Sequence, residues 1–439
     1  MIRRLPTLIF LLALGIPTPA AAQNRLSLAD AIARARSQNL DARSAASVER
    51  GAQQRITQAR AGYLPKVDLS ESWQRGDQPV FVFSSLLAQR QFTESNFAID
   101  ALNHPDAVDN FRAALTVEQA LLNPATSANV RAARISHDVA TLGRQLVDQD
   151  LAVAVTDAYG HVLISAASKQ AAAAAVEAAG ADRELASNRR DAGLVTDADV
   201  LQLDVHLART REQQIRADSE ERIARARLNQ VMGEPLDSLF ILDAALDAAA
   251  LAVNDVPSLE AEALKNRADV KLASLQEQLA GAARDAARAG FLPQVTAQAG
   301  WEANGGQWNS RAGSWVVGVV ARINLLQGFG DRARVAEARE QMTRGALARE
   351  RAETAARLDV RVALARLDAA RASEAAGRVA AEQARESRRI IRDRYEGGLT
   401  DVASLLRAAE AVQQAETRQI AAKVDVMLTA ATLERALGK

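Results

Sequence analysis

Glycines that follow a predicted strand and open a predicted helix could bind a dinucleotide. The run GFGDRA at 328–333 has this context, in which backbone N–H groups at a helix N-terminus would hold the pyrophosphate. A Rossmann unit also needs a second parallel strand within about 30 residues, whereas here the helical pattern continues for about twice that length. The corresponding turn in the first half of the chain, LNPA at 122–125, lacks the glycines. The run is therefore interpreted as a strand-to-helix turn.

Side chains that could act as catalysts or metal ligands form no recognisable group in the sequence. The four histidines, His104, His137, His161 and His206, show no close ligand spacing, and there is no cysteine for a metal site or a disulfide. The many aspartates and glutamates alternate with arginine, a pattern typical of solvated helix faces. Neither a nucleophile elbow nor a P-loop is present. The sequence therefore predicts no enzyme, no metal and no cofactor.

Export is predicted by residues 1–22. Two arginines precede an apolar run from Leu8 to Ile16, and Ala20-x-Ala22 offers a small-residue cleavage site before Gln23. A retained anchor would need about 18–20 continuous apolar residues, and two prolines end the run well before that. No later stretch is expected to be long and apolar enough for a transmembrane helix, so a mature chain that enters a membrane would do so as a closed β-barrel.

The balance of charge argues against nucleic acid as a partner. The chain has 54 basic and 54 acidic residues, and loss of residues 1–22 would leave 52 against 54. This balance implies no basic face. Alanine, arginine, glutamate and leucine are abundant, which is typical of long helices or coiled coils.

The elements that would carry a site occur twice. The segment AGYLPKV at 61–67 returns as AGFLPQV at 289–295, a shift of 228 residues, and a shift of 205 superposes 134–233 on 339–438 without a gap. Repeats of roughly 200 residues are too long for solenoid units, which recur every 20–50 residues. The sequence therefore predicts a duplicated half-structure, with repeat 1 at 23–235 and repeat 2 at 236–439.

Long helical hairpins are predicted at about 125–233 and 331–437. Proline in a helix interior costs about 3 kcal/mol, and none occurs between Pro124 and Pro235 or after Pro293. Apolar residues recur every three to four positions, the stripe of an amphipathic helix. Glycines at 193 and at 397–398 interrupt this pattern, so each interval is expected to fold back on itself, with a first arm of roughly 100 Å.

Four strands are predicted outside the hairpins, at about 65–76, 110–121, 293–302 and 313–325. Their apolar and polar residues alternate over about 10 positions, as in membrane barrel strands with an apolar side toward lipid. A soluble sheet with one wet face would also alternate, but it would not explain why the tryptophans lie in or between these strands. Membrane-interface aromatics are predicted at four positions: Trp73, Trp301, Trp308 and Trp315.

Two different connections join these strands. Residues 302–312 are expected to form a short polar loop. Residues 77–109 form a long segment with four phenylalanines. This segment is either an extracellular plug or contact surface, or a cap that packs on itself, and both possibilities stay open.

The order of strand, loop, strand and long hairpin, given twice, resembles the TolC family of outer-membrane efflux channels. The opening helix at LSLADA (26–31) and the AGYLP and AGFLP starts of the first strands contribute to the resemblance, which covers essentially the whole mature chain. It implies an α+β membrane protein that forms a homotrimer. Each chain would give four strands to one shared 12-stranded β-barrel, and its hairpins to a periplasmic α-helical coiled-coil tunnel.

The resemblance also implies location and partners. The protein would sit in the outer-membrane lipid of a Gram-negative bacterium, with a large periplasmic part. It would passively conduct substrates from a periplasmic adaptor (membrane fusion) protein and an inner-membrane pump of RND or ABC type to the exterior, in efflux or type I secretion. Drug, metal and protein substrates all remain open. A periplasmic coiled-coil adaptor or structural protein is the alternative, although it would have no membrane strands, and an exported enzyme lacks a candidate site.

The hairpin tips are the candidate contact site. Glycine would supply the positive φ of each reversal, and threonine would cap the next helix. Turn chemistry does not explain an apolar Leu194 or Leu399 at a solvent-facing end, and the resemblance implies that these tips contact the adaptor. The two tips comprise Gly193, Leu194, Val195 and Thr196, and Gly398, Leu399 and Thr400.

The resemblance places the periplasmic entrance beside the tips. Asp199 and Tyr395 occupy positions where relatives form a latch, in which a phenol donates to a carboxylate. The alternative is a helix-packing aromatic and a carboxylate that favours a helix N-terminus. Ser404 and Arg407 stand where some relatives carry acidic rings, so the ion selectivity of the entrance is left open.

Overall fold

The computed structural model describes residues 25–243 and 255–439, so the predicted signal peptide lies outside the described residues. The chain divides into two compact units. The long helices α5 (Pro124–Asp191) and α9 (Gly330–Glu396) each contribute to both units, which therefore do not coincide with the two sequence repeats. Unit 1 comprises Met1–Asn39, Leu151–Leu251 and Ala365–Thr432, and unit 2 comprises Leu40–Asp150, Ala252–Leu364 and Leu433–Lys439.

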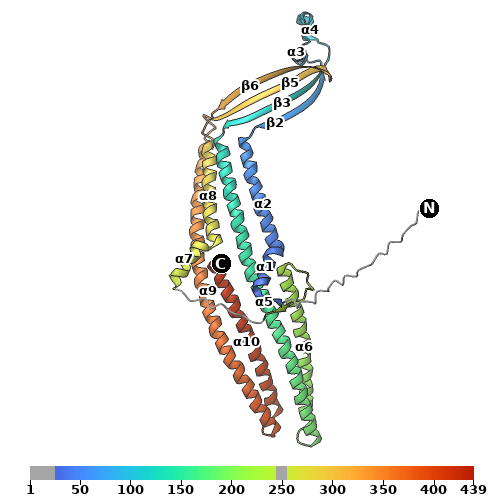
Figure 1. The fold of residues 1–439 in the computed structure, drawn as a ribbon, viewed down its shortest axis with the longest axis vertical. Coiled ribbons are helices and arrows are strands. Elements are labelled where there is room, and N and C mark those ends of the chain that lie inside the picture. The colour runs from blue at the N-terminus through green and yellow to red at the C-terminus, as the bar shows by residue number, and fades with distance from the viewer. Residues whose placement is uncertain (1–24, 244–254) are drawn as a thin grey trace, which may run out of the picture. The chain divides into compact units, whose positions relative to one another are not determined.

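Unit 1 contains the two helical reversals. Helix α6 (Asp197–Met232) runs back beside α5, and α10 (Val402–Ala436) runs back beside α9 (Figure 1). Helix α1 (Leu28–Gln38) begins at Ser27, whose side chain accepts from the Asp30 N–H, and it contacts α6. A short parallel pair joins β1 (Arg25–Leu26) to β4 (Ile241–Leu242).

Tyr159 fastens this strand pair to α5. Its hydroxyl donates to the carbonyl oxygens of Leu26, at 2.9 Å, and Asp243, at 3.0 Å. The side chain is almost fully buried, and burial raises the pKa of the phenol to about 12. A buried hydroxyl with two carbonyl partners is well satisfied, so Tyr159 has a structural role.

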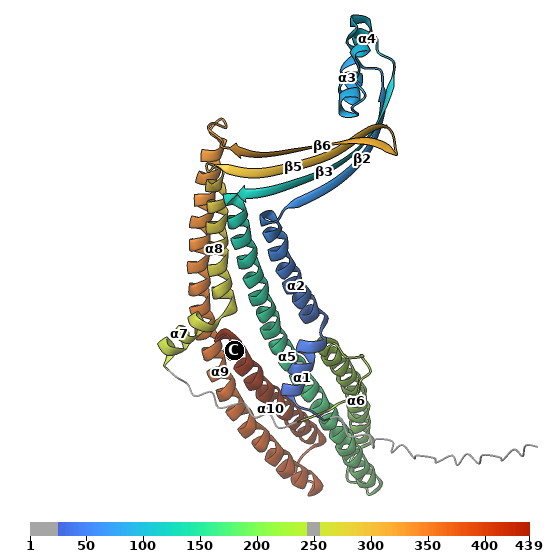
Figure 2. The same cartoon turned by 45° about the horizontal axis from the view of Figure 1, so that its top comes forward.

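Unit 2 is built on one antiparallel sheet in the order β2-β3-β5-β6 (Figure 2). Outside the β2–β3 segment, unit 2 also contains α2 (Leu40–Arg60), the short η1 (Ala61–Tyr63), α7 (Val256–Asn266) and α8 (Ala268–Ala289). The four strands are β2 (Lys66–Gly76), β3 (Val108–Leu122), β5 (Gln294–Gln307) and β6 (Ser310–Arg322). They lie where the period-2 alternation was found.

The connection between β5 and β6 is much shorter than the polar loop expected at 302–312. Only residues 308–309 separate the two strands, and Gln307 pairs with Ser310. The register shifts between Asn304 and Gln307, so an irregularity accommodates the two glycines there. The expectation was wrong because polar and glycine residues extend the strand pair beyond the apolar alternation.

One face of the sheet is strongly apolar. The other is mostly polar, although it includes Val316 and Val320 of β6. Leu69 pairs with Leu115, Leu115 with Trp301 and Trp301 with Trp315, which gives an apolar row across all four strands. Leu69 and Trp315 are each 75% exposed in the single chain. On the opposite face Arg112 pairs with Glu302 at 2.8 Å. An exposed apolar row of this extent is typical of a surface that contacts a membrane or another protein.

The segment between β2 and β3 packs on itself. It contains α3 (Pro79–Ala88), η2 (Glu94–Phe97) and α4 (Ile99–Asn103). Phe92 stacks edge-on against Phe83 and Phe97, with ring centroids 4.8 and 5.1 Å apart. These contacts favour the self-packed cap, since the aromatic side chains are used to hold the segment together.

The duplication is visible in two glycine contacts, one in each unit. Gly233 ends α6 with a φ of 78°, and Gly438 follows α10 with a φ of 81°. A Cβ at Gly233 would lie 2.7 Å from backbone atoms of Gln38, and one at Gly438 would lie 2.7 Å from the backbone nitrogen of Arg267. Positive φ and backbone contact both exclude a side chain there.

A side-chain donor accompanies each glycine contact. Asn39 donates through Nδ2 to the carbonyl of Val231 at 2.8 Å, and Arg267 donates through Nη1 to the carbonyl of Ala436 at 3.5 Å. Residues 39 and 267 differ by the first repeat shift, and 231 and 436 by the second. Both halves of the chain thus satisfy an equivalent helix-end carbonyl in the same way.

Among the described residues, one helix is long and apolar enough to cross a membrane by length and composition alone. An 18-residue stretch of α5 has a mean hydropathy of 1.3, and 44% of it is buried within the protein. A core helix can pass the same test, so this stretch is weak evidence for a membrane span. The expectation that no such stretch follows the signal peptide is nevertheless wrong for α5.

Candidate functional site at the hairpin tips

Both tips reverse through the same backbone motif. Gly193 and Gly398 have φ values of 75° and 73°. The Leu194 N–H donates to the carbonyl of Arg189 at 2.9 Å, and the Leu399 N–H donates to the carbonyl of Arg394 at 2.8 Å. These are Schellman-type helix ends, in which glycine takes the left-handed position. The motif places a leucine directly after the glycine in each tip.

The helices that leave the tips are capped differently. Thr196 caps α6 in a capping box: its side chain accepts from the Asp199 N–H, and the Asp199 carboxylate accepts from the Thr196 N–H at 2.9 Å. At the second tip Asp401, not Thr400, accepts from the Ser404 N–H at 2.9 Å. Hydrogen bonding from Ser404 lowers the pKa of Asp401. The expected threonine cap is therefore wrong for the second tip, because Asp401 holds the position equivalent to Thr196.

The two leucines lie open at the tips. Leu194 is 66% exposed and Leu399 is 71% exposed in the single chain. Val195 and Thr400 beside them are half-buried. Neither leucine side chain takes part in the hydrogen bonds of the reversals, so both are available for an apolar contact.

The tips of the two hairpins share one small core. Tyr395, at the end of α9, is 3% exposed, and Leu203 and Leu405 are fully buried. The cluster takes side chains from α5, α6, α9 and α10, all within unit 1. Its buried members are Ala186, Val200, Leu203, Tyr395, Val402 and Leu405.

Asp199 and Tyr395 are not hydrogen-bonded to each other within the chain. The Asp199 carboxylate accepts from Thr196, and the Tyr395 hydroxyl is buried with no hydrogen-bond partner in the described parts of the chain. Burial raises the pKa of the Tyr395 phenol. Within the single chain, Tyr395 therefore packs in the core at the tips, and Asp199 caps α6.

Arg189 makes the polar contact between the tips. Its Nη1 donates to the backbone carbonyl of Tyr395, and its guanidinium carbon lies 5.2 Å from the centroid of the Tyr395 ring. Sequence reasoning missed this residue because nothing local distinguishes Arg189 from Arg190. Arg407, by contrast, lies on the exposed side of α10, where its Nη2 donates to Ser404 Oγ at 3.1 Å.

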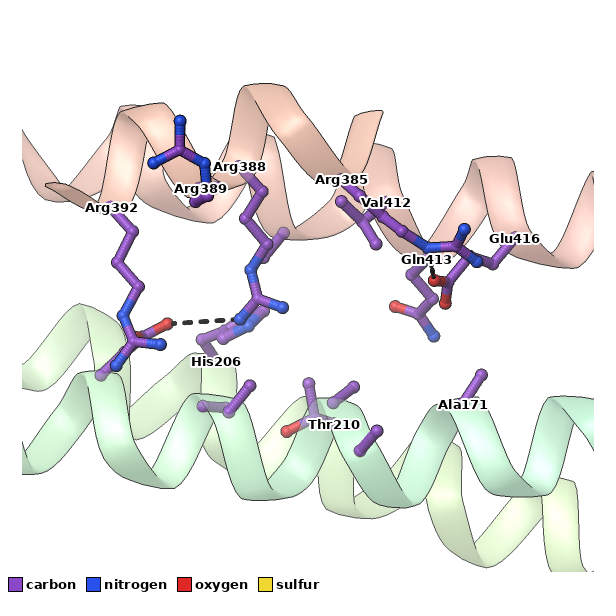
Figure 3. Close-up of a pocket in the computed structure, with 16 residues that line it drawn as sticks. Ala171, His206, Thr210, Arg385, Arg388, Arg389, Arg392, Val412, Gln413 and Glu416 are labelled. Atoms are coloured by element: carbon purple, nitrogen blue, oxygen red, sulfur yellow. Dashed lines mark hydrogen bonds and ion pairs between the residues drawn. The ribbon is translucent and has the colours of Figure 1, made fainter. Parts of the chain in front are cut away.

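A cavity of about 360 Å³ lies between the two hairpins (Figure 3). Asp182 is buried there 3.9 Å from Arg388, and burial raises the pKa of Asp182. Burial also lowers the pKa of His206. Arginines at 385, 388, 389 and 392 line one side, a helical spacing that could have been found in the sequence. The parts of the chain that the structure describes hold no group of metal-ligating side chains.

A duplicated chain with two long hairpins and a four-stranded sheet with one apolar face has the architecture of a membrane exit duct. The family model described as "Outer membrane efflux protein" matches residues 31–234 and 259–439. The chain belongs to this family. It is an outer-membrane channel that serves as an exit duct in efflux or secretion, located in the Gram-negative outer membrane with a periplasmic part.

Individual relatives agree with this assignment. The chain is 28% identical over 387 residues to protein CyaE of Bordetella pertussis, covering 87% of this chain and 77% of that protein. Its fold is similar to that of the outer-membrane channel OprN, with a TM-score of 0.77 and 22% identity over 94% of this chain and 89% of the other. The CmeC outer-membrane channel of Campylobacter jejuni gives a TM-score of 0.78 at 15% identity, over 94% and 85% of the two chains.

Proposed function

We propose that three copies of this chain form one duct, and that each gives its four strands to a shared 12-stranded barrel. Strands β2 and β6 are the two edges of the sheet. An unpaired backbone group in lipid costs several kcal/mol, so a sheet of four strands needs neighbours to close. The observation that carries the proposal is the sheet with one apolar face and two free edges, because it suits lipid only as part of a closed ring.

The hairpins would form the periplasmic tunnel, and their tips would contact an adaptor. The exposed Leu194 and Leu399 support an apolar docking contact at this end. Family members are trimeric channels that work with adaptor proteins and inner-membrane pumps. The duct adds no chemistry of its own in this proposal, so the attached pump, of RND or ABC type, would select a drug, metal or protein as cargo.

Assembly tests the proposal directly. The protein is expected to fractionate with outer membranes as a trimer that survives mild detergent and dissociates on boiling, since strand pairing across three chains satisfies all the sheet edges. Semi-native electrophoresis and light scattering in detergent would measure this. A monodisperse monomer that stays soluble without detergent would contradict the shared barrel.

Ion selectivity tests the proposed entrance. Arg407 is exposed on α10, with Ser404 as its neighbour, and would place three positive charges near the opening of a trimer. Arg407→Asp is expected to shift the reversal potential in planar bilayers toward cations, because a charge of one sign focuses ions of the other. Arg418→Asp, farther along the same helix, is the control. An equal shift in both variants would mean that Arg407 is not at a selective constriction.

A further inference from the structure

We propose that Arg189 is a polar clamp that fixes the two hairpin tips of one protomer to each other, in addition to their shared apolar core, and thereby keeps the entrance closed. The inference rests on the proposed function for the location of the entrance. The clamp itself rests on contacts within unit 1, where the last turn of α5 meets the last turn of α9.

Arg189 binds a backbone carbonyl at the negatively charged C-terminal end of α9. Tyr395 lies in the last turn of α9, where carbonyl groups lack intrahelical partners and carry a partial negative charge. Its oxygen accepts from the Gly398 N–H at 3.0 Å and also from Arg189 Nη1. A guanidinium is the stronger donor of the two because it is charged. The positive side chain of one hairpin therefore caps the negative end of the other.

The shape of the second tip suits the guanidinium. The Arg189 group stacks against the Tyr395 ring, which favours a planar cation. At Gly398, a Cβ would lie 3.3 Å from Arg189 Nη2, so the glycine leaves room for the arginine as well as for its own positive φ. The Arg189 guanidinium thus contacts the Tyr395 carbonyl and ring, and lies next to Gly398.

The neighbouring groups have other partners. Asp199 is held in the α6 capping box, and the Tyr395 hydroxyl contributes no hydrogen bond in the described structure. Arg190 turns to its own hairpin, 2.6 Å from Asp191 and 4.0 Å from Asp197. Arg190 is therefore a matched control for charge and position along α5.

Single-channel conductance of the purified protein in planar bilayers measures closure. Arg189→Ala is expected to raise the ratio of open to closed channels roughly tenfold, as loss of one charged hydrogen bond implies. Arg189→Lys should restore closure only in part, because an ammonium cannot stack and donate as a planar fork. Arg190→Ala should behave as wild type. Tyr395→Phe should also behave as wild type. If Asp199 and Tyr395 formed a latch, Tyr395→Phe would instead open the channel as much as Arg189→Ala does.

A second measurement separates the clamp from the location of the entrance. The chain has no cysteine, so spin labels at Leu194→Cys and Leu399→Cys can report the distance between the tips by pulsed electron resonance. Arg189→Ala should lengthen and broaden this distance. Unchanged distances would overturn the clamp. A longer distance with unchanged conductance would keep Arg189 as the clamp and show that the tips are not the constriction. If Arg190→Ala changed the distance equally, the effect would come from loss of positive charge and not from the Arg189 contacts, and the clamp would be overturned.

Discussion

Export is expected to fall to background when Leu194 and Leu399 are both replaced by aspartate. The two side chains are largely exposed in the single chain, so the substitution should cost the protein little stability. At an apolar adaptor contact each aspartate would have to lose its hydration, and an unpaired buried charge is strongly unfavourable. Export of a reporter substrate, or drug resistance, in cells that carry the matching pump and adaptor would measure the loss.

Trimer yield and membrane location serve as controls for this double variant and should match wild type. Leu194→Met combined with Leu399→Met keeps the contact apolar at similar volume, and it should therefore retain most of the export. Full export by the aspartate variant would mean that the leucines only complete the turns. Loss of the trimer would instead assign them to assembly.

Arg267→Ala is expected to destabilise unit 2 by roughly 2–3 kcal/mol. The Arg267 side chain is 8% exposed and lies 2.6 Å from Asp269 and 2.9 Å from Asp359. Breaking a fully buried pair costs about 3–5 kcal/mol, and the partial exposure of both aspartates reduces that figure. The denaturation midpoint followed by circular dichroism would measure the change. Arg361→Ala removes a pair with Glu260 in the same unit. The Arg361 side chain is largely exposed, so its effect should be smaller than that of Arg267→Ala.

The effect of Arg267 should also depend on pH. Burial raises the pKa of Asp269, but the hydrogen bonds and charge of Arg267 outweigh burial and hold that pKa below its usual 3.8. A carboxyl with a lowered pKa stabilises the fold fully above its unfolded-state pKa and loses this contribution as the pH falls through the lower, folded-state value. The gap between wild type and Arg267→Ala should therefore be constant near neutrality and narrow below pH 3.8. If the stability difference between wild type and Arg267→Ala did not change with pH, ionised Asp269 would not contribute to the effect of Arg267.

The strands and hairpins could be predicted because each depends on local pattern. Period-2 alternation located β2 and β3, and the absence of proline located α5 and α9. The β5–β6 connection was misjudged because the strand pair continues past an irregularity at Gly305 and Gly306, where there is no alternation to detect. The cap at Asp401 was missed by one position, since Thr400 also has a side chain suited to capping.

The site was predictable only as far as each tip is a local structure. The glycine turns and the exposed leucines follow from residues that are neighbours in sequence. The contact of Arg189 with Tyr395 joins residues 206 positions apart, and it exists only when two hairpins pack together. The same holds for the buried Asp182 and its half-buried neighbour Arg388, whose chemistry depends on a cavity that no local pattern specifies.

The equivalent contacts at Gly233 and Gly438 show which residues each half of the chain uses at the same structural position. At the position that serves the helix-end carbonyl, one half uses the amide of Asn39 and the other the guanidinium of Arg267. Since both versions fold within one molecule, the helix-end carbonyl accepts either a neutral or a charged side-chain donor. The charge of Arg267 has a separate role in its pairs with Asp269 and Asp359. The glycines themselves are identical in the two halves. A designer who varies the donor at either position would therefore keep a group that can reach the carbonyl, keep the ion pairs of Arg267 satisfied, and leave both glycines in place.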